Sequence, residues 1–156
     1  MKSEQMASDK QSIQNSILVV DDEFDIVTLI KRALQNHGFN TLGFTDPLIA
    51  LEHFQNNSKT FAMVISDIRM PSMNGYEFIR KIKAIHPTIK TILISAFEIN
   101  KNEFSKVMPS VKIDGFIAKP ISLKELVNIV ENILKKKKRK AKNIRKNTSA
   151  SLRKNL

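Results

Sequence analysis

Cysteine is absent from this chain of 156 residues, which excludes disulfides, thiolate metal sites and a cysteine nucleophile. No run of apolar residues is long enough to span a bilayer. Residues 1–15 are polar and of mixed charge, and they lack the apolar core of a signal peptide. We therefore expect a cytoplasmic protein without a membrane span, whose first fifteen residues are disordered.

Acidic residues are absent from residues 135–156, which contain eleven lysines and arginines. The whole chain has 26 basic and 15 acidic residues, so residues 1–134 hold 15 of each and carry no net charge. The formal charge of +11 therefore belongs to the last segment alone. We expect a neutral domain at 16–134 and a basic tail at 135–156. The tail should be helical for a turn or two and disordered beyond Asn143.

Apolar runs typical of β-strands alternate with amphipathic stretches typical of helices. In the first helical stretch, Ile26, Leu29 and Ile30 recur on one face. The expected strands are 17–20, 39–44, 61–66, 91–95 and 113–118, and the expected helices are 24–36, 47–55, 76–85, 102–107 and 122–134. Five β-α units in a row imply an α/β fold with a parallel sheet and helices on both faces, because parallel strands need crossover connections.

Polar side chains stand at the carboxyl ends of four of these strands. Asp21 and Asp22 follow the first strand, and Asp67 follows the third. Ser95 ends the fourth strand, and Lys119 follows the fifth. In a doubly wound sheet of order 2-1-3-4-5, the first and third strands flank the point where a crevice opens at the carboxyl ends. We therefore expect the three acids to converge on one site.

The residue types at this site suit a divalent cation and phosphate chemistry. Mg²⁺ prefers oxygen ligands, so Asp22 and Asp67 are natural direct ligands and Asp21 is suited to act through water. Three carboxylates and Lys119 sum to a charge of −2, which a divalent cation neutralises. An aspartate oxygen can attack phosphorus to give an acyl phosphate. Lys119 and the hydroxyl of Ser95 would then contact phosphoryl oxygens.

Each of these features has a plainer interpretation when it is taken alone. An Asp-Asp pair after a strand is often only the N-cap of the next helix, here near Glu23. A strand-terminal aspartate in a loop with proline and glycine is more often part of a turn than a nucleophile. A Lys-Pro pair or a terminal serine says little by itself. Their joint occurrence at four strand ends of five favours a site.

Together these motifs resemble a response-regulator receiver domain, such as the single-domain chemotaxis response regulator. The resemblance covers about residues 15–135, and the matched stretches are 17–23, 67–77, 94–96 and 115–120. It implies a flavodoxin-like fold and phosphotransfer from a histidine kinase to Asp67. The metal ligands that it implies are Asp21, Asp22, Asp67 and the backbone carbonyl of Arg69. It further implies that Ser95 and Phe116 form a switch, that Lys119 binds the phosphate, and that the Lys119–Pro120 peptide is cis.

The chain departs from this family in two places. Residues 106–113 lack the small Gly-Ala pair usual before the fifth strand, and Pro109 cannot lie inside a helix without breaking it. We therefore expect a short or irregular fourth helix. Phe116 has no hydroxyl, so packing alone would hold its inward position. The scattered histidines are interpreted as surface or capping residues; they are His37, His53 and His86.

Three functions are compatible with these features. The first is a stand-alone receiver that catalyses only its own phosphorylation and dephosphorylation. It would signal to a protein partner through the face formed by the helix at 102–107, the strand at 113–118 and the helix at 122–134. The second is a nucleic-acid-binding protein that uses residues 135–156 under the control of the receiver, without sequence preference because the segment has no aromatic residue to stack on bases. The third, a scaffold with an inactive site, is disfavoured by the complete set of acids, lysine and serine.

Overall fold

The computed structural model describes residues 15–96, 105–106 and 108–154. Its strands are β1 (Ser16–Val20), β2 (Thr41–Phe44), β3 (Phe61–Asp67), β4 (Lys90–Ser95) and β5 (Gly115–Ala118). Its helices are α2 (Phe24–Asn36), α3 (Pro47–Asn57), α4 (Gly75–Ile85) and α6 (Leu123–Lys154), with a 3₁₀ turn η1 (Ser58–Thr60). The expected disorder at the N-terminus concerns residues 1–14, which lie outside the described residues.

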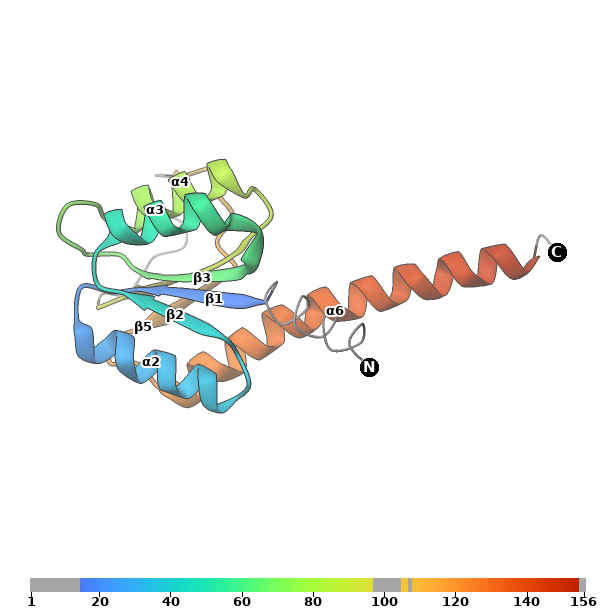
Figure 1. Cartoon of the computed structure of the whole chain (residues 1–156), viewed down its shortest axis with the longest axis horizontal. Helices are drawn as coiled ribbons and strands as arrows, with labels where there is room; N and C mark the ends of the chain where they lie inside the picture. The colour runs from blue at the N-terminus through green and yellow to red at the C-terminus, as the bar shows by residue number, and fades with distance from the viewer. Residues whose placement is uncertain (1–14, 97–104, 107, 155–156) are drawn as a thin grey trace.

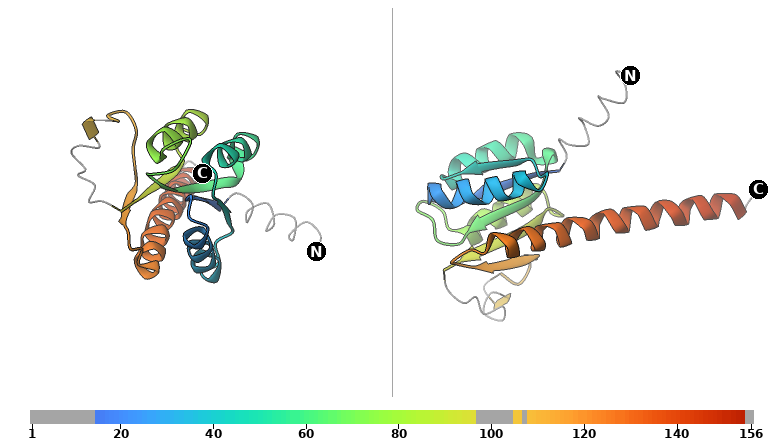
Figure 2. Two further views of the ribbon diagram at one scale, coloured as in Figure 1. Left: turned by 90° about the vertical axis from the view of Figure 1, so that its left-hand side faces the viewer. Right: turned by 90° about the horizontal axis from the view of Figure 1, so that it is seen from below.

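The five strands form one parallel sheet of order β2-β1-β3-β4-β5, which confirms the predicted fold. Helices α3 and α4 cover one face, and α2 and α6 cover the other (Figures 1 and 2). All seven residues of the central strand β3 are buried. A strand covered on both faces needs apolar side chains in both directions, which is why β3 is a continuous apolar run before its final serine and aspartate.

Alternation along the strands divides the interior into two clusters. Leu18 and Val64 lie in the cluster that contains the buried residues of α3 and α4. Ile17 and Met63, one residue earlier in each strand, lie in the cluster that contains those of α2 and α6. The sheet is thus fastened to a helical layer on each side, which holds the strand ends in fixed relative positions.

Side chains that cap the helices fix where three of them begin. Asp46 accepts a hydrogen bond from the Leu48 amide at the start of α3, and Asn74 accepts one from the Glu77 amide at the start of α4. The Glu125 amide donates to the Ser122 hydroxyl at 3.3 Å, at the start of α6.

The predicted helix at 122–134 is much longer in the structure than expected. We expected it to end a turn or two into the basic tail, with disorder beyond Asn143, but α6 continues to Lys154 (Figure 1). Residues 144–154 are thus described as helical, in place of the disorder that we expected there. The segment contains no glycine or proline, and lysine, arginine, alanine and leucine are good helix formers. The prediction rested on like charges and on asparagine and serine, which are weaker helix formers, and the helix continues despite both.

Two smaller expectations are only partly met. Of the predicted helix 102–107, residues 105–106 are helical, and residues 102–104 and 107 lie outside the described residues. His37 and His86 lie at the C-caps of α2 and α4, as expected. His53 instead packs inside α3, with its ring 5.3 Å from that of Phe44 and 5.9 Å from that of Phe61. It is half-buried, and its contacts with two aromatic rings were not predicted. In the part of the chain that the structure describes, no helix is long and apolar enough to cross a bilayer.

We predict that Phe54→Ala destabilises the domain strongly. The side chain is fully buried between α3 and the sheet, and its ring stacks on that of Phe61 at 5.6 Å. Loss of its buried contacts and the resulting cavity should cost about 3–5 kcal/mol in the free energy of urea unfolding. Phe24→Ala is the matched control, because Phe24 is 71% exposed and its removal should cost within about 0.5 kcal/mol. Equal losses in the two variants would contradict this account of the core.

Candidate functional site

Loops at one end of the sheet bring the predicted side chains together. Asp21 follows β1, Asp67 ends β3 and Ser95 ends β4, while Lys119 follows β5. Carboxylate oxygens of Asp21, Asp22 and Asp67 all lie within 4.8 Å of one another. The order β2-β1-β3 makes β1 and β3 neighbours, so the acids that follow them meet at the carboxyl edge.

Asp21 is fully buried, whereas Asp22 is exposed. Asp21 Oδ1 accepts a hydrogen bond of 2.9 Å from the Glu23 amide. Asp21 Oδ2 lies 3.0 Å from Lys119 Nζ in an ion pair. The simple N-cap interpretation of the Asp-Asp pair does not hold, because Glu23 is the N-cap residue of α2 and its side chain makes no capping bond.

Lys119 is the common partner of the acids. Its ammonium lies 3.0 Å from Asp21, 3.4 Å from Asp67 and 3.5 Å from Glu23. Its backbone amide donates to the Ser95 carbonyl at 2.7 Å, which continues the pairing of β4 with β5 beyond the strands. The Lys119–Pro120 peptide is cis, as the resemblance implied.

Asp67 is held by the loop that follows β3. The residue is 5% exposed, and its Oδ1 accepts a hydrogen bond of 2.9 Å from the Ile68 amide. The loop folds back so closely that the Gly75 amide donates to the Ile68 carbonyl at 2.7 Å. A Cβ at position 75 would lie 2.2 Å from the backbone oxygen of Asp67, so only glycine fits at this point. Ser72, in the same loop, has a φ of 71°.

Ser95 and Phe116 lie on neighbouring strands beside this cluster. Ser95 is 7% exposed at the end of β4. Phe116 pairs with Leu93 across β4 and β5, and its partly buried ring packs against the cluster beneath α3 and α4. Ser95 lies two positions after Leu93, the partner of Phe116, so the two side chains stand near each other on neighbouring strands.

The environment of the site disfavours the charged forms of its own carboxyl groups. Burial, and then the charge of Asp21, raise the pKa of Asp67 to about 6, although Lys119 and the Ile68 amide act in the opposite direction. Burial likewise raises the pKa of Asp21. Burial alone would lower the pKa of Lys119, but its carboxylate partners outweigh that effect and raise it. The site therefore holds more negative charge than one ammonium can balance.

Comparison with known proteins agrees with this geometry. A family model of the response regulator receiver domain matches residues 17–131. This chain belongs to that family. It is therefore a receiver domain of the kind that serves signal transduction in two-component response regulators. The predicted resemblance is confirmed.

The proteins that this receiver resembles differ in length, so the chain covers different shares of them. It is 30% identical over 119 residues to the response regulator receiver protein CpdR of Brucella abortus, covering 76% of this chain and 95% of that one. It is 32% identical over 121 residues to the sensor kinase CckA of the same organism, where the match covers 78% of this chain but only 13% of the kinase. A receiver domain crystal structure from Clostridium thermocellum, 27% identical, superposes with a TM-score of 0.70 over 80% of this chain and 97% of that one.

The donor set of this receiver fits a divalent cation such as Mg²⁺. Every candidate side-chain ligand is a carboxylate oxygen, the type that Mg²⁺ prefers. The buried Asp21 Oδ2, whose partner is the Lys119 ammonium at 3.0 Å, has a further lone pair that a cation or a cation-bound water could take. Exposed Asp22 leaves one side open to solvent, where the ion could keep waters. Arg69 lies two residues beyond Asp67 in the loop, and the role of its backbone carbonyl as a metal ligand stays a prediction.

Sequence reasoning assigned no role to two residues of this site. Glu23 adds a third carboxylate near Lys119, at 3.5 Å. Its position directly after the Asp-Asp pair was the available signal. Gly75 allows the loop to close over the end of β3, and that requirement is set by a contact with Asp67 eight residues earlier. Such a contact could not be read from the sequence.

We predict that Asp67→Asn stabilises the metal-free receiver near neutral pH. Between about pH 4 and the folded-state pKa of about 6, the folded receiver keeps a proton on Asp67 that the unfolded chain has released. Stability therefore falls as the pH rises through this window. Asparagine avoids that loss, and the variant should gain about 1–3 kcal/mol near pH 7 but little near pH 4. Urea unfolding at the two pH values measures the difference.

Added Mg²⁺ provides the control for this experiment. The cation would pair with the Asp67 carboxylate of the native receiver and restore its stability, so the advantage of asparagine should shrink or reverse. A gain that is equally large at both pH values would show that charge at position 67 is not the cause.

Proposed function

We propose that Asp67 of this receiver accepts a phosphoryl group from a histidine kinase in a reaction that requires Mg²⁺. The observation that carries this proposal is the position of Asp67, a carboxylate 5% exposed and 3.4 Å from the Lys119 ammonium, beside the carboxylates of Asp21 and Asp22. The Oδ–P bond would form as the N–P bond of the donor phosphohistidine breaks, and the imidazole leaves.

In this proposal each residue of the site has its own role in binding or in balancing charge. The Ile68 amide, through its bond to Oδ1, orients the Asp67 carboxylate. Lys119 is held by two buried acids and would contact one phosphoryl oxygen with its ammonium. Asp21 and Asp22 would hold the cation. When bound, Mg²⁺ would supply the countercharge that makes an incoming phosphate tolerable.

We propose that phosphorylation is signalled through Ser95 and Phe116. A phosphoryl oxygen on Asp67 would draw the Ser95 hydroxyl inward, and the space left behind would admit the Phe116 ring. Because Phe116 lacks a hydroxyl, packing against the cluster under α3 and α4 is what stabilises either position. The output partner would then bind the face formed by the predicted helix 102–107, β5 and α6.

Three further points belong to this proposal. The receiver catalyses only its own phosphorylation and dephosphorylation, because phosphoryl transfer to Asp67 needs no other nucleophile from the chain. It resides in the cytoplasm together with its kinase.

A second candidate function is nucleic-acid binding through residues 135–156, and the continuation of α6 to Lys154 with no acidic residue after Glu131 favours it.

Phosphoryl transfer to Asp67 is tested with acetyl phosphate as the donor. Intact-mass measurement should find one phosphoryl adduct on the native receiver and none on Asp67→Asn. Without Mg²⁺ the rate of adduct formation should fall by at least about tenfold. Asp25→Asn is the matched control, because Asp25 is an exposed acid in the first turn of α2 and its loss should leave the adduct. An adduct on Asp67→Asn would overturn the assignment.

The switch is tested by NMR with beryllofluoride, which stands in for the phosphoryl group on Asp67. Ring signals of Phe116 should shift between the free and the beryllofluoride-bound receiver, and Ser95→Ala should reduce that shift. Phe54, fully buried under α3, provides a reference ring whose signals should stay in place. An unchanged Phe116 environment in the bound form would rule out this mechanism.

A further inference from the structure

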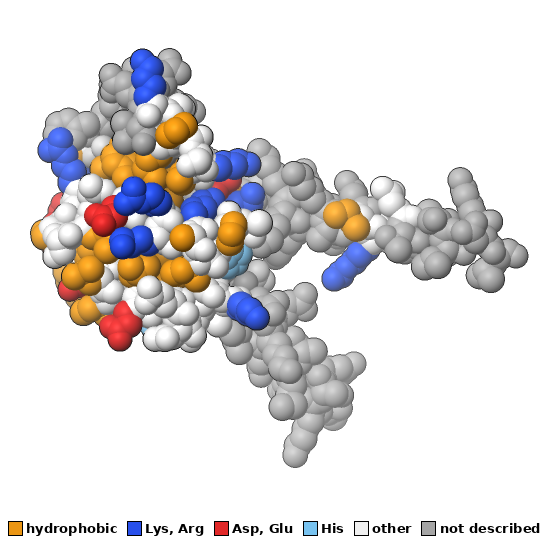
Figure 3. All heavy atoms as spheres, turned by 90° about the horizontal axis from the view of Figure 1, so that it is seen from above, with side chains coloured by type: hydrophobic (Ala, Val, Ile, Leu, Met, Phe, Trp, Pro, Cys, Tyr) orange, Lys and Arg blue, Asp and Glu red, His pale blue; other side chains and the backbone are white. Residues whose placement is uncertain are grey.

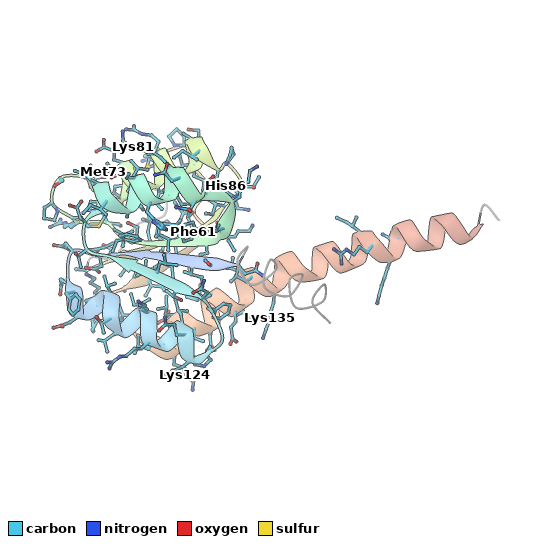
Figure 4. The ribbon with its side chains drawn as sticks, viewed as in Figure 1. Phe61, Met73, Lys81, His86, Lys124 and Lys135 are labelled. Atoms are coloured by element: carbon cyan, nitrogen blue, oxygen red, sulfur yellow. The ribbon has the colours of Figure 1, made fainter. Side chains whose placement is uncertain are left out.

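Helix α6 is longer than the domain that it covers. It packs on the sheet through Leu126, Val127 and Val130, then continues away from the sheet to Lys154 (Figures 1 and 2). Figure 4 places Lys135 where the helix leaves the domain. Residues 135–154 span about 30 Å at the rise of an α-helix. This segment, which we call the α6 extension, is the feature that receiver chemistry does not require.

Basic residues on the α6 extension follow the period of the helix. Positions separated alternately by four and three residues share one face of a helix. Five of the six such positions from 135 onward are basic, and the sixth is Ser149. We call this row the basic stripe: Lys135, Arg139, Lys142, Lys146 and Arg153. On the opposite face the same count gives Lys137, Ala141, Ile144, Thr148 and Ser151. A merely solvating extension needs charge but no such period.

The positive charge of the stripe is scarcely balanced by the chain itself. No acidic residue follows Glu131 in the sequence. Glu131 pairs with Lys135 at 3.7 Å, but the lysine is 65% exposed, and such surface pairs contribute little. Like charges at i, i+4 destabilise a helix by about 0.2–0.5 kcal/mol per pair. The extension therefore carries a repulsion that a bound polyanion would relieve.

The domain adds basic residues beside the base of the extension. Lys90 and Lys112 share one carboxylate, Asp114, at 3.7 and 4.0 Å, and Lys112 is 79% exposed. Asp114 precedes Gly115, and a Cβ on that glycine would lie 3.7 Å from Ile133 of α6. These lysines thus stand close to where α6 leaves the sheet. Figure 3 shows lysine and arginine side chains gathered on the domain at this junction.

The phosphorylation site lies at the other end of the molecule. Met73, in the loop after Asp67, is at the end of the domain opposite to Lys135 (Figure 4). A strand of five residues separates the ends by about 16 Å, which is about two Debye lengths at physiological salt. A polyanion on the basic end is therefore screened from the acidic site.

We infer that the basic stripe binds the phosphate backbone of duplex nucleic acid without base preference. This rests on the second candidate function above and names the face and the ligand. An α-helix of about 10–12 Å diameter fits the major groove, which is about 12 Å wide. Near the domain, the run of six basic residues at 135–140 adds positive charge all around the helix by its period. A membrane surface is disfavoured, because Ile144 and Leu152 alone are too sparse for a helix that lies in lipid.

Two full-length variants with equal loss of charge test this inference. The stripe variant replaces Lys135, Arg139, Lys142, Lys146 and Arg153 by Gln. The matched variant replaces Lys136, Lys137, Lys140, Arg145 and Lys154 by Gln, all outside the stripe. Glutamine keeps good helix propensity, so circular dichroism should find equal helix content in both. Anisotropy of a labelled random-sequence DNA duplex measures affinity at several salt concentrations.

The native chain should lose several hundred-fold in affinity between about 50 and 200 mM salt, as expected for about five neutralised phosphates. The stripe variant should bind at least about tenfold more weakly than the matched variant and show a flatter salt dependence. Equal weakening of the two variants would overturn the stripe while leaving nucleic-acid binding intact. No binding by the native chain at low salt would overturn both. Tighter binding to phosphatidylserine vesicles than to the duplex, lost in the stripe variant, would assign the stripe to a membrane instead.

Discussion

The ion pairs of Lys119 are the interaction on which the site depends. One ammonium, on the segment that follows β5, lies within 3.4 Å of carboxylates that follow β1 and end β3. Those three strands are not consecutive in the sheet, so the contact spans β4 as well. The sheet can present the acids at this spacing only because both of its faces are fixed by packed helices. The lysine in turn offsets part of the repulsion that the spacing creates.

Lys119 offsets only part of the repulsion between the carboxylates, and the negative charge that remains would favour a bound cation. Two carboxylates are almost wholly buried, and burial raises the pKa of each, that of Asp67 to about 6. A site with such an excess of negative charge gains stability from any cation that enters it. If Mg²⁺ binds as we propose, the unbalanced negative charge of the metal-free site would be the source of the affinity. In the same proposal, a phosphoryl group would be acceptable only after that charge has been balanced, which would couple the two ligands.

The two ends of the receiver differ in charge because of chain direction. In a parallel sheet with crossover helices, all strand ends meet at one edge and all helix ends at the other. The acids occupy the first edge. Helix α6 leaves from the second, and its extension carries the basic stripe away from the phosphorylation site (Figure 1). The two proposed ligands, an anionic partner of the stripe and a phosphodonor at Asp67, would therefore not compete for the same surface.

The sequence by itself determined the fold class, because five apolar runs alternating with helical periods allow few arrangements. It also determined the acids, Lys119 and Ser95 as site residues, since each stands directly after a strand or at its end. Only the tertiary structure decided the electrostatics of the site. Burial of Asp21 and the reach of Lys119 to Glu23 depend on contacts between distant strands. The length of α6 was likewise undecided, because helix propensity and charge repulsion oppose each other along residues 135–154. The requirement for Gly75 came from the approach of one backbone to another, a distance that no local pattern encodes.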